Sequence, residues 1–139
     1  MSVDKAFIDT NIFLYLFSNS ASDLKKRQCA FSVLNDYDCQ ISTQVLNEFS
    51  NVCVRKWKLP APQVKSLVSQ IMAYCDTAYI YEDTIEQALD INHRYGFSYY
   101  DCLMISSALE RGCKYLISED MADGQIIEGL LTIKNVFTK

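Results

Sequence analysis

The sequence predicts an α/β fold in which helices cover both faces of a mainly parallel sheet. Short apolar stretches of strand length alternate along the chain with longer stretches whose apolar residues have helical spacing. Such alternation is typical of a parallel sheet between layers of helices. The 139 residues contain no internal repeat, low-complexity stretch or linker-like segment, so we expect a single domain over residues 1–139.

The expected strands are the apolar stretches 3–8, 39–42, 78–81, 114–118 and 131–136. Helical spacing of apolar residues predicts helices between them, at about 12–17, 22–35, 43–57, 64–74, 83–95 and 98–110. Thr10 or Asn11 can cap the first of these helices. Asp83 and Glu86 resemble a capping box for the fifth.

Two glycines predict where the last two helices end. Gly96 follows the fifth helix and Gly112 follows the sixth. Glycine adopts the left-handed conformation at helix ends without steric cost, so each can terminate the helix before it.

The cysteine pattern favours a reducing compartment. The six cysteines are at least ten positions apart, no C-x-x-C pair occurs, and His93 is the only histidine. A structural zinc site therefore has little support, and buried, reduced thiols are the better interpretation. No apolar run reaches the roughly 20 residues of a membrane span, and no secretion signal is recognisable, so we expect a cytoplasmic protein without a membrane segment.

The net charge of −4 argues mildly against nucleic-acid binding, which usually uses a basic face. Four negative charges could belong to a single acidic cluster, which would leave the remaining surface near neutral. Basic groups do occur, at 25–27, 55–58 and 111–114. Each of them, taken alone, is more simply a solvated helix face. Charge does not decide the matter.

Four acidic residues are expected to converge on one edge of the sheet. Asp9 ends the first strand and Asp120 follows the fourth, whereas Glu48 and Asp101 lie early in helices that begin near this edge. Ligands of open α/β sheets bind beyond the carboxyl ends of the strands. Asp123 is three residues beyond Asp120 and could join the group.

Converging carboxylates repel one another unless a cation lies among them. Because no histidine or cysteine accompanies these acids, Mg²⁺ or Mn²⁺ fits better than zinc or copper. Such a metal can activate water and stabilise charge during displacement at phosphorus. Thr10, Asn11 and Ser118 could orient the acids through hydrogen bonds.

Each of these residues also has a simpler structural interpretation. Asp101 can complete a variant capping box with Ser98, Asp9 can cap a helix, Asp120 can lie in a turn, and Glu48 can be a solvated helix acid. Thr10, Asn11 and Ser118 can serve in helix capping or turns. The metal hypothesis gains its weight from the convergence of four acids on one edge.

Four ordered motifs resemble the PIN-domain nucleases, and especially the toxins of VapBC-type toxin–antitoxin pairs. They are residues 7–12 (FIDTNI), 45–49 (VLNEF), 100–103 (YDCL) and 116–121 (LISEDM). The stretches 123–127 and 133–137 also look like the family's C-terminal strand region. The resemblance covers essentially the whole chain.

This resemblance implies a PIN-like α/β/α sandwich with Mg²⁺- or Mn²⁺-dependent endoribonuclease activity. Asp9, Glu48, Asp101 and Asp120 match the family's metal-binding acids, and Asp123 matches an additional acid. The implied reaction is attack of an activated water on an RNA phosphodiester, leaving 5′-phosphate and 3′-hydroxyl ends. Toxin members often form homodimers and are blocked by a cognate antitoxin protein.

Other functions remain open at this point. A PIN-like nuclease of RNA processing or of flapped DNA would have the same acids, and a catalytically silent PIN-like module could bind a partner. A phosphatase of the haloacid dehalogenase type is a poor fit because Asn11 stands where its second Asp is needed. Glu119, an extra acid beside Asp120, departs from the family pattern.

Overall fold

The computed structural model describes residues 3–137 and has a mainly parallel sheet at its centre. Within these residues the sheet has six strands in the order β3-β2-β1-β4-β6-β5. Their bounds are β1 (Lys5–Ile8), β2 (Asp38–Ser42), β3 (Asp76–Ala78), β4 (Tyr115–Ile117), β5 (Ile126–Ile127) and β6 (Leu131–Lys134). Only the short β5 is antiparallel, to β6.

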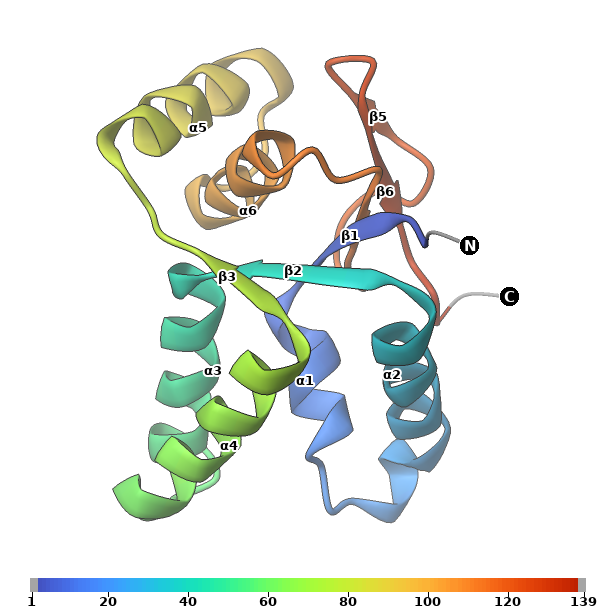
Figure 1. Cartoon of the computed structure of the whole chain (residues 1–139), viewed down its shortest axis with the longest axis vertical. Helices are drawn as coiled ribbons and strands as arrows, with labels where there is room; N and C mark the ends of the chain where they lie inside the picture. The colour runs from blue at the N-terminus through green and yellow to red at the C-terminus, as the bar shows by residue number, and fades with distance from the viewer. Residues whose placement is uncertain (1–2, 138–139) are drawn as a thin grey trace.

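Helices cover both faces of the sheet. They are α1 (Thr10–Leu16), α2 (Leu24–Asp36), α3 (Thr43–Arg55), α4 (Ala61–Tyr74), α5 (Glu82–Tyr95) and α6 (Tyr99–Glu110), with a 3₁₀ turn at Ala21–Asp23. In Figure 1, α5 and α6 lie above the sheet, whereas α1 to α4 lie below it. The predicted α/β/α architecture is therefore confirmed.

The core lies where β1 meets its neighbours. Ala6, Phe7 and Ile8 of β1 are fully buried, since β2 and β4 flank this strand and helices cover it. Helix α6 packs against β1, β2 and β4, and seven consecutive residues of it, 102–108, are buried. Because β1 is followed in the sheet by β2 on one side and β4 on the other, a crevice forms beyond its carboxyl end.

The structure corrects the predicted third strand. The strand was expected at residues 78–81, but it covers Asp76–Ala78 and so ends where it was expected to begin. Its last residue, Ala78, lies opposite Ser42 of β2. Tyr79 and Tyr81 are both 66% exposed, so the aromatic, strand-like composition of this stretch misleads. The fifth predicted strand also ends early, at Lys134, and β5 was not predicted because two residues carry no periodic signal.

The capping predictions have mixed outcomes. Asp83 and Glu86 do not form the expected capping box: α5 begins at Glu82, and the Thr84 hydroxyl accepts the Tyr81 backbone N–H at 3.2 Å. Thr84 Oγ1 also donates to Glu110, which anchors α5 to α6. Gly96 (φ +80°) and Gly112 (φ +68°) adopt the predicted left-handed conformation at the helix ends.

The cysteine prediction agrees with the structure. The six cysteines, all within residues 3–137, form no disulfide; five are buried and Cys29 is half-buried. Across residues 3–137, none of the helices combines the length and apolar character that a membrane span requires.

Candidate active site

A hollow of about 350 Å³ opens beyond the carboxyl ends of β1 and β4. It gathers residues from α1, α3, α6 and the segment after β4: Asp9, Thr10, Asn11, Leu14, Glu48, Asn51, Val52, Asp101, Met104 and Asp120. All four acids that the sequence singled out therefore line the same hollow, although they span more than a hundred positions of sequence.

Asp9 is the most buried of these acids, at 6% exposure. Its backbone N–H donates to Ile117 O at 3.0 Å and so continues the pairing of β1 with β4. Its Oδ1 accepts the Thr10 backbone N–H at 2.6 Å, and its Oδ2 accepts the Ser118 hydroxyl at 2.7 Å. Asp9 is thus the N-cap of α1, and the expectation that Thr10 or Asn11 caps this helix is wrong.

Burial raises the pKa of Asp9 to about 6, because removing a carboxylate from water disfavours its charged form. The hydrogen bonds from Ser118 and Thr10 work in the opposite direction, while the negative charges of Asp101 and Glu48 raise the pKa further. A carboxyl group with this pKa is mostly ionised at pH 7 and takes up its proton about one pH unit below neutral.

Glu48 is held at both carboxylate oxygens. Its Oε1 accepts the Thr10 hydroxyl at 3.0 Å, and its Oε2 accepts Gln44 Nε2 at 3.0 Å. Helix α3 buries Val45 and Phe49, and the half-buried Glu48 at the edge of this apolar face lines the hollow. Gln44 was not predicted, although its position four residues before Glu48 is the helical spacing at which side chains meet.

Asp101 is half-buried and Asp120 is exposed. The Asp101 backbone N–H donates to Ser98 Oγ at 3.4 Å, so the capping role of Ser98 exists, yet the Asp101 carboxylate makes no hydrogen bond within residues 3–137. Asp120 Oδ2 accepts Asn11 Nδ2 at 3.2 Å. The Oδ1 atom of Asn11 is buried and has no hydrogen-bond partner in the described chain. The unpaired Oδ1 of Asn11 and the Asp101 carboxylate are therefore oxygen atoms at the hollow that could act as metal ligands.

The segment that carries Asp120 is anchored by its neighbour Glu119. Glu119 accepts hydrogen bonds from the Tyr15 hydroxyl and from Lys26 Nζ, both at 2.5 Å. Partial burial raises the pKa of Glu119, but these hydrogen bonds outweigh it and hold the pKa below its usual value. The extra acid that seemed a departure from the family is therefore paired. No local sequence pattern could have predicted this pairing, because the partners of Glu119 are 93 and 104 positions away.

Asp123 is not among the residues that line the hollow. Its Oδ1 accepts the Asn135 backbone N–H at 2.8 Å and so ties the turn after Asp120 to the end of the sheet. Ser118 is fully buried and reaches the site through Asp9 and through the Asp120 backbone N–H, which donates to Ser118 Oγ at 3.4 Å.

The donor set fits a hard cation, although the acids are not closed around one point. Within residues 3–137, no three Asp, Glu, His or Cys side chains are close enough together to hold a metal ion as they stand. The groups at the hollow are nonetheless oxygen donors, which Mg²⁺ and Mn²⁺ prefer. The orphaned Asn11 Oδ1 and the buried Asp9 carboxylate both lack the compensation that a cation would provide.

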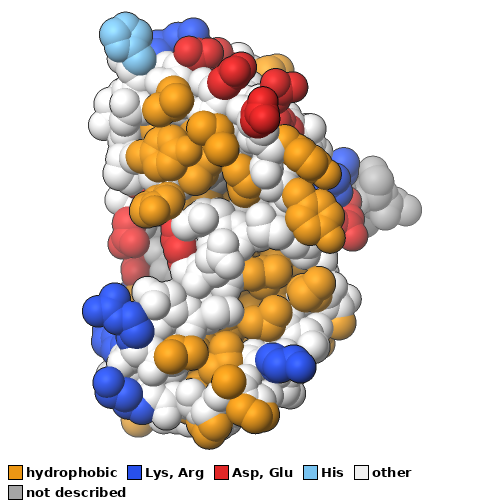
Figure 2. Space-filling view, turned by 90° about the vertical axis from the view of Figure 1, so that its left-hand side faces the viewer, with side chains coloured by type: hydrophobic (Ala, Val, Ile, Leu, Met, Phe, Trp, Pro, Cys, Tyr) orange, Lys and Arg blue, Asp and Glu red, His pale blue; other side chains and the backbone are white. Residues whose placement is uncertain are grey.

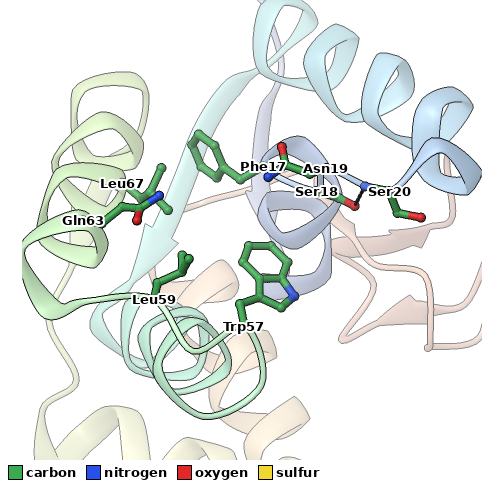
Figure 3. A pocket seen from close by; sticks show the side chains of 8 residues that line it. All are labelled: Phe17, Ser18, Asn19, Ser20, Trp57, Leu59, Gln63 and Leu67. Atoms are coloured by element: carbon green, nitrogen blue, oxygen red, sulfur yellow. Dashed lines mark hydrogen bonds between the residues drawn. The ribbon is translucent and has the colours of Figure 1, made fainter.

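A larger hollow of about 530 Å³ lies between the end of α1 and the connection from α3 to α4 (Figure 3). Aromatic and polar side chains line it, among them Phe17 and Trp57, and Ser18 Oγ accepts the Ser20 backbone N–H at 3.1 Å. None of its lining residues has an acidic, basic or imidazole side chain. This larger hollow therefore offers no carboxylate, amine or imidazole for acid–base chemistry or metal binding.

This fold is that of a PIN domain. A family model described as the PIN domain matches residues 6–122, most of the chain, and the protein belongs to this family. Among curated proteins, no significant match is found.

Several solved structures share the fold at low sequence identity. A toxin–antitoxin complex from Klebsiella pneumoniae aligns with a TM-score of 0.71 and 19% identity, covering 95% of this chain and 98% of that one. VapC20 of Mycobacterium tuberculosis, a toxin that cleaves the sarcin-ricin loop, gives 0.64 and 17%, covering 80% and 86%. VapBC2 of Rickettsia felis, bound to a promoter DNA fragment, gives 0.62 and 16%, covering 94% and 99%. At these identities the likeness establishes a common fold.

Proposed function

We propose that the protein is a metal-dependent endoribonuclease that acts as the toxin of a toxin–antitoxin pair. The observation that carries this proposal is the convergence of Asp9, Glu48, Asp101 and Asp120 on a single hollow beyond the carboxyl ends of β1 and β4. A PIN domain is a nuclease fold, and four acids in one hollow are more than capping and turn chemistry require.

The four acids are the groups that hold Mg²⁺ or Mn²⁺ in this proposal. A bound metal would supply Lewis-acid activation of water and neutralise charge developing on the phosphate. Thr10 and Gln44 fix the two oxygens of Glu48, and Ser118 fixes one oxygen of Asp9, so these residues orient the ligands. Asp123 is left outside the ligand set, since it lies outside the hollow and bonds the Asn135 backbone.

The choice of RNA and of an antitoxin partner rests on the structural neighbours. VapC20 is described as cleaving an RNA loop, and the Klebsiella and Rickettsia structures are toxin–antitoxin complexes of the same fold. A cognate antitoxin is therefore part of the proposal. A homodimer is proposed on the family resemblance alone.

Cleavage of total cellular RNA by the purified protein tests this function. Samples contain Mg²⁺, Mn²⁺ or EDTA, and a single-stranded DNA of matched length distinguishes RNA from DNA cleavage. We expect metal-dependent cutting of RNA with 5′-phosphate products, lost in Asp101→Asn, whose carboxylate makes no hydrogen bond within residues 3–137. Full activity in EDTA or in Asp101→Asn would contradict the proposed site, and cutting of DNA alone would contradict the proposed substrate.

The toxin role needs a separate test in cells. Induced expression in a bacterial host is expected to arrest growth, whereas the Asp101→Asn variant at the same protein level leaves growth normal. A small gene adjacent to this one, co-expressed, is expected to restore growth if it encodes the antitoxin. Normal growth with active wild-type enzyme would point instead to a PIN nuclease of RNA processing.

A further inference from the structure

A basic hollow adjoins the acidic one. It measures about 330 Å³ and is lined by Asn51, Val52, Arg55, Lys56 and Lys58. Asn51 and Val52 also line the acidic hollow, so the two hollows adjoin. They meet at these two residues.

The geometry of α3 explains why the two hollows lie side by side. Glu48, Asn51, Val52 and Arg55 are spaced at i, i+3, i+4 and i+7, which places them along one face of α3. Seven residues at 1.5 Å rise put Arg55 about 10 Å along the axis from Glu48. Lys56 caps the helix end and Lys58 lies just beyond, with φ of +56°. The groove therefore runs from the acids towards the C-terminal end of α3.

These three cations have no partner within the described chain. Residues 3–137 contain twelve of the thirteen Lys and Arg residues. Seven of the twelve make hydrogen bonds or ion pairs: Lys5, Lys26, Arg27, Arg94, Arg111, Lys114 and Lys134. Arg55, Lys56 and Lys58 are exposed and make none within these residues, and three of the five uncommitted cations thus line one hollow beside the acids.

The space-filling view agrees with this arrangement. On one edge of the molecule, Lys and Arg side chains gather directly beside a group of acidic side chains (Figure 2). The basic residues at the C-terminal end of α3 also complement its helix dipole, which is a purely structural role. That role accounts for Arg55 and Lys56, but it requires neither the hollow nor Lys58, which lies past the helix end.

We propose that this basic hollow binds backbone phosphates of a single-stranded RNA while the scissile phosphate lies at the four acids. The inference rests on the proposed nuclease function. It adds a second contact point for the RNA and places the strand along α3, from the acids towards the C-terminal end of the helix. The span of about 10 Å along α3 exceeds the step between neighbouring phosphates of one strand, so the second contact lies beyond the phosphate next to the cut. An acidic protein with net charge −4 can then bind RNA, because the uncommitted positive charge is concentrated beside the site.

A pair of charge-matched double variants tests the proposal. Lys56→Gln/Lys58→Gln removes two cations from the hollow, and Lys25→Gln/Lys65→Gln removes two other cations that make no ion pair within the described residues. Each is assayed on a dinucleotide, which cannot span both hollows, and on an octanucleotide with the same cleavage site. We expect KM for the octanucleotide to rise about tenfold in Lys56→Gln/Lys58→Gln, with kcat and the dinucleotide KM unchanged.

The control variant is expected to match wild type on both substrates. Equal KM values for the octanucleotide in the two double variants would overturn the proposal. A change in melting temperature without a change in KM would assign these lysines to the helix dipole alone, which also overturns it.

Direct binding separates this inference from the nuclease proposal. Fluorescence anisotropy with labelled octanucleotide, in the Asp101→Asn background with Mg²⁺, gives Kd over a range of salt. The binding constant falls as salt rises, and for two phosphate contacts on a single strand the magnitude of that slope, log K against log salt, should decrease by about 1.4 in Lys56→Gln/Lys58→Gln. If wild type cuts no RNA but this slope change is found, the nuclease proposal fails and the binding site stands.

An acidic polypeptide is the competing ligand for such a surface. Poly-glutamate of equal charge is therefore titrated in the same assay. Binding of poly-glutamate as tightly as RNA, lost in the same variant, would assign the hollow to a protein partner and overturn the RNA assignment.

Discussion

The Ser118 hydroxyl donates a 2.7 Å hydrogen bond to Oδ2 of Asp9, joining residues 109 positions apart at the ends of β4 and β1. Both residues are buried, and the parallel pairing of these two strands brings them together. The most buried acid of the site is thus positioned by the sheet itself. This bond and the Thr10 backbone N–H favour the ionised form of Asp9 and offset part of the cost of its burial.

Ser118→Ala is expected to destabilise the protein by about 1–3 kcal/mol at pH 8, since it leaves a buried carboxylate with one fewer hydrogen-bond donor. The bond from Ser118 lowers the pKa of Asp9, so its loss should raise that pKa further. Urea unfolding at pH 5 and pH 8 measures both effects. The loss should be larger at pH 8, where Asp9 is ionised. An equal loss at the two values would show that the bond does not act on the charged form.

The free energy of unfolding should depend on pH through Asp9. The folded protein holds this proton more tightly than the unfolded chain, because the pKa rises from 3.8 to about 6 on folding. The contribution to stability is fully present below pH 4 and is lost as pH rises through 6, by roughly 3 kcal/mol in the absence of metal.

Asp9→Asn tests this pH dependence. The variant has no carboxyl group to titrate, so relative to wild type in EDTA it should gain stability between pH 4 and pH 7. Parallel urea titrations of the two proteins provide the comparison. A constant difference across this range would mean that burial of Asp9 does not govern the pH dependence.

Lys26→Met should loosen the segment that carries Asp120. Lys26 and Tyr15 hold Glu119 next to it, and Lys26 is 41% exposed at its side chain, so the stability cost should stay below about 1 kcal/mol. The Mg²⁺ concentration for half-maximal cleavage should rise severalfold while the melting temperature changes little.

Arg94→Met is the matched control for this prediction. Arg94 forms an ion pair with Glu128, on elements that do not line the acidic hollow. The Arg94→Met variant should need the same Mg²⁺ concentration as wild type for half-maximal cleavage. If both variants shift the metal requirement alike, or neither does, Lys26 and Glu119 do not position Asp120.

The architecture could be predicted from sequence because the strongest signals were long. Helices of 12–14 residues with an apolar face, such as α3 and α5, were located to within a few residues. Short elements were less well predicted: Tyr79 and Tyr81 have strand-like composition but no strand to pair with, since the neighbouring strand β2 ends at Ser42, opposite Ala78. Local composition cannot report where a neighbouring strand ends.

The candidate site could be predicted in part. Asp9, Glu48, Asp101 and Asp120 could be placed at one sheet edge because strand order and helix starts imply it. The partners of Glu119 and the unbonded Oδ1 of Asn11 could not, because they depend on side-chain contacts between distant segments. Asn51 could have been found from its spacing to Glu48 on α3.

The most direct test of whether the four acids form a metal centre is a calorimetric titration with Mn²⁺ at pH 7.5. It compares the wild-type protein with the Asp101→Asn variant. Wild type should bind Mn²⁺ with displacement by Mg²⁺, and binding should weaken below pH 6 as Asp9 takes up a proton. Asp101→Asn, still folded, should bind at least tenfold more weakly. Equal Mn²⁺ affinity in the two proteins, or no binding by wild type, would contradict the account.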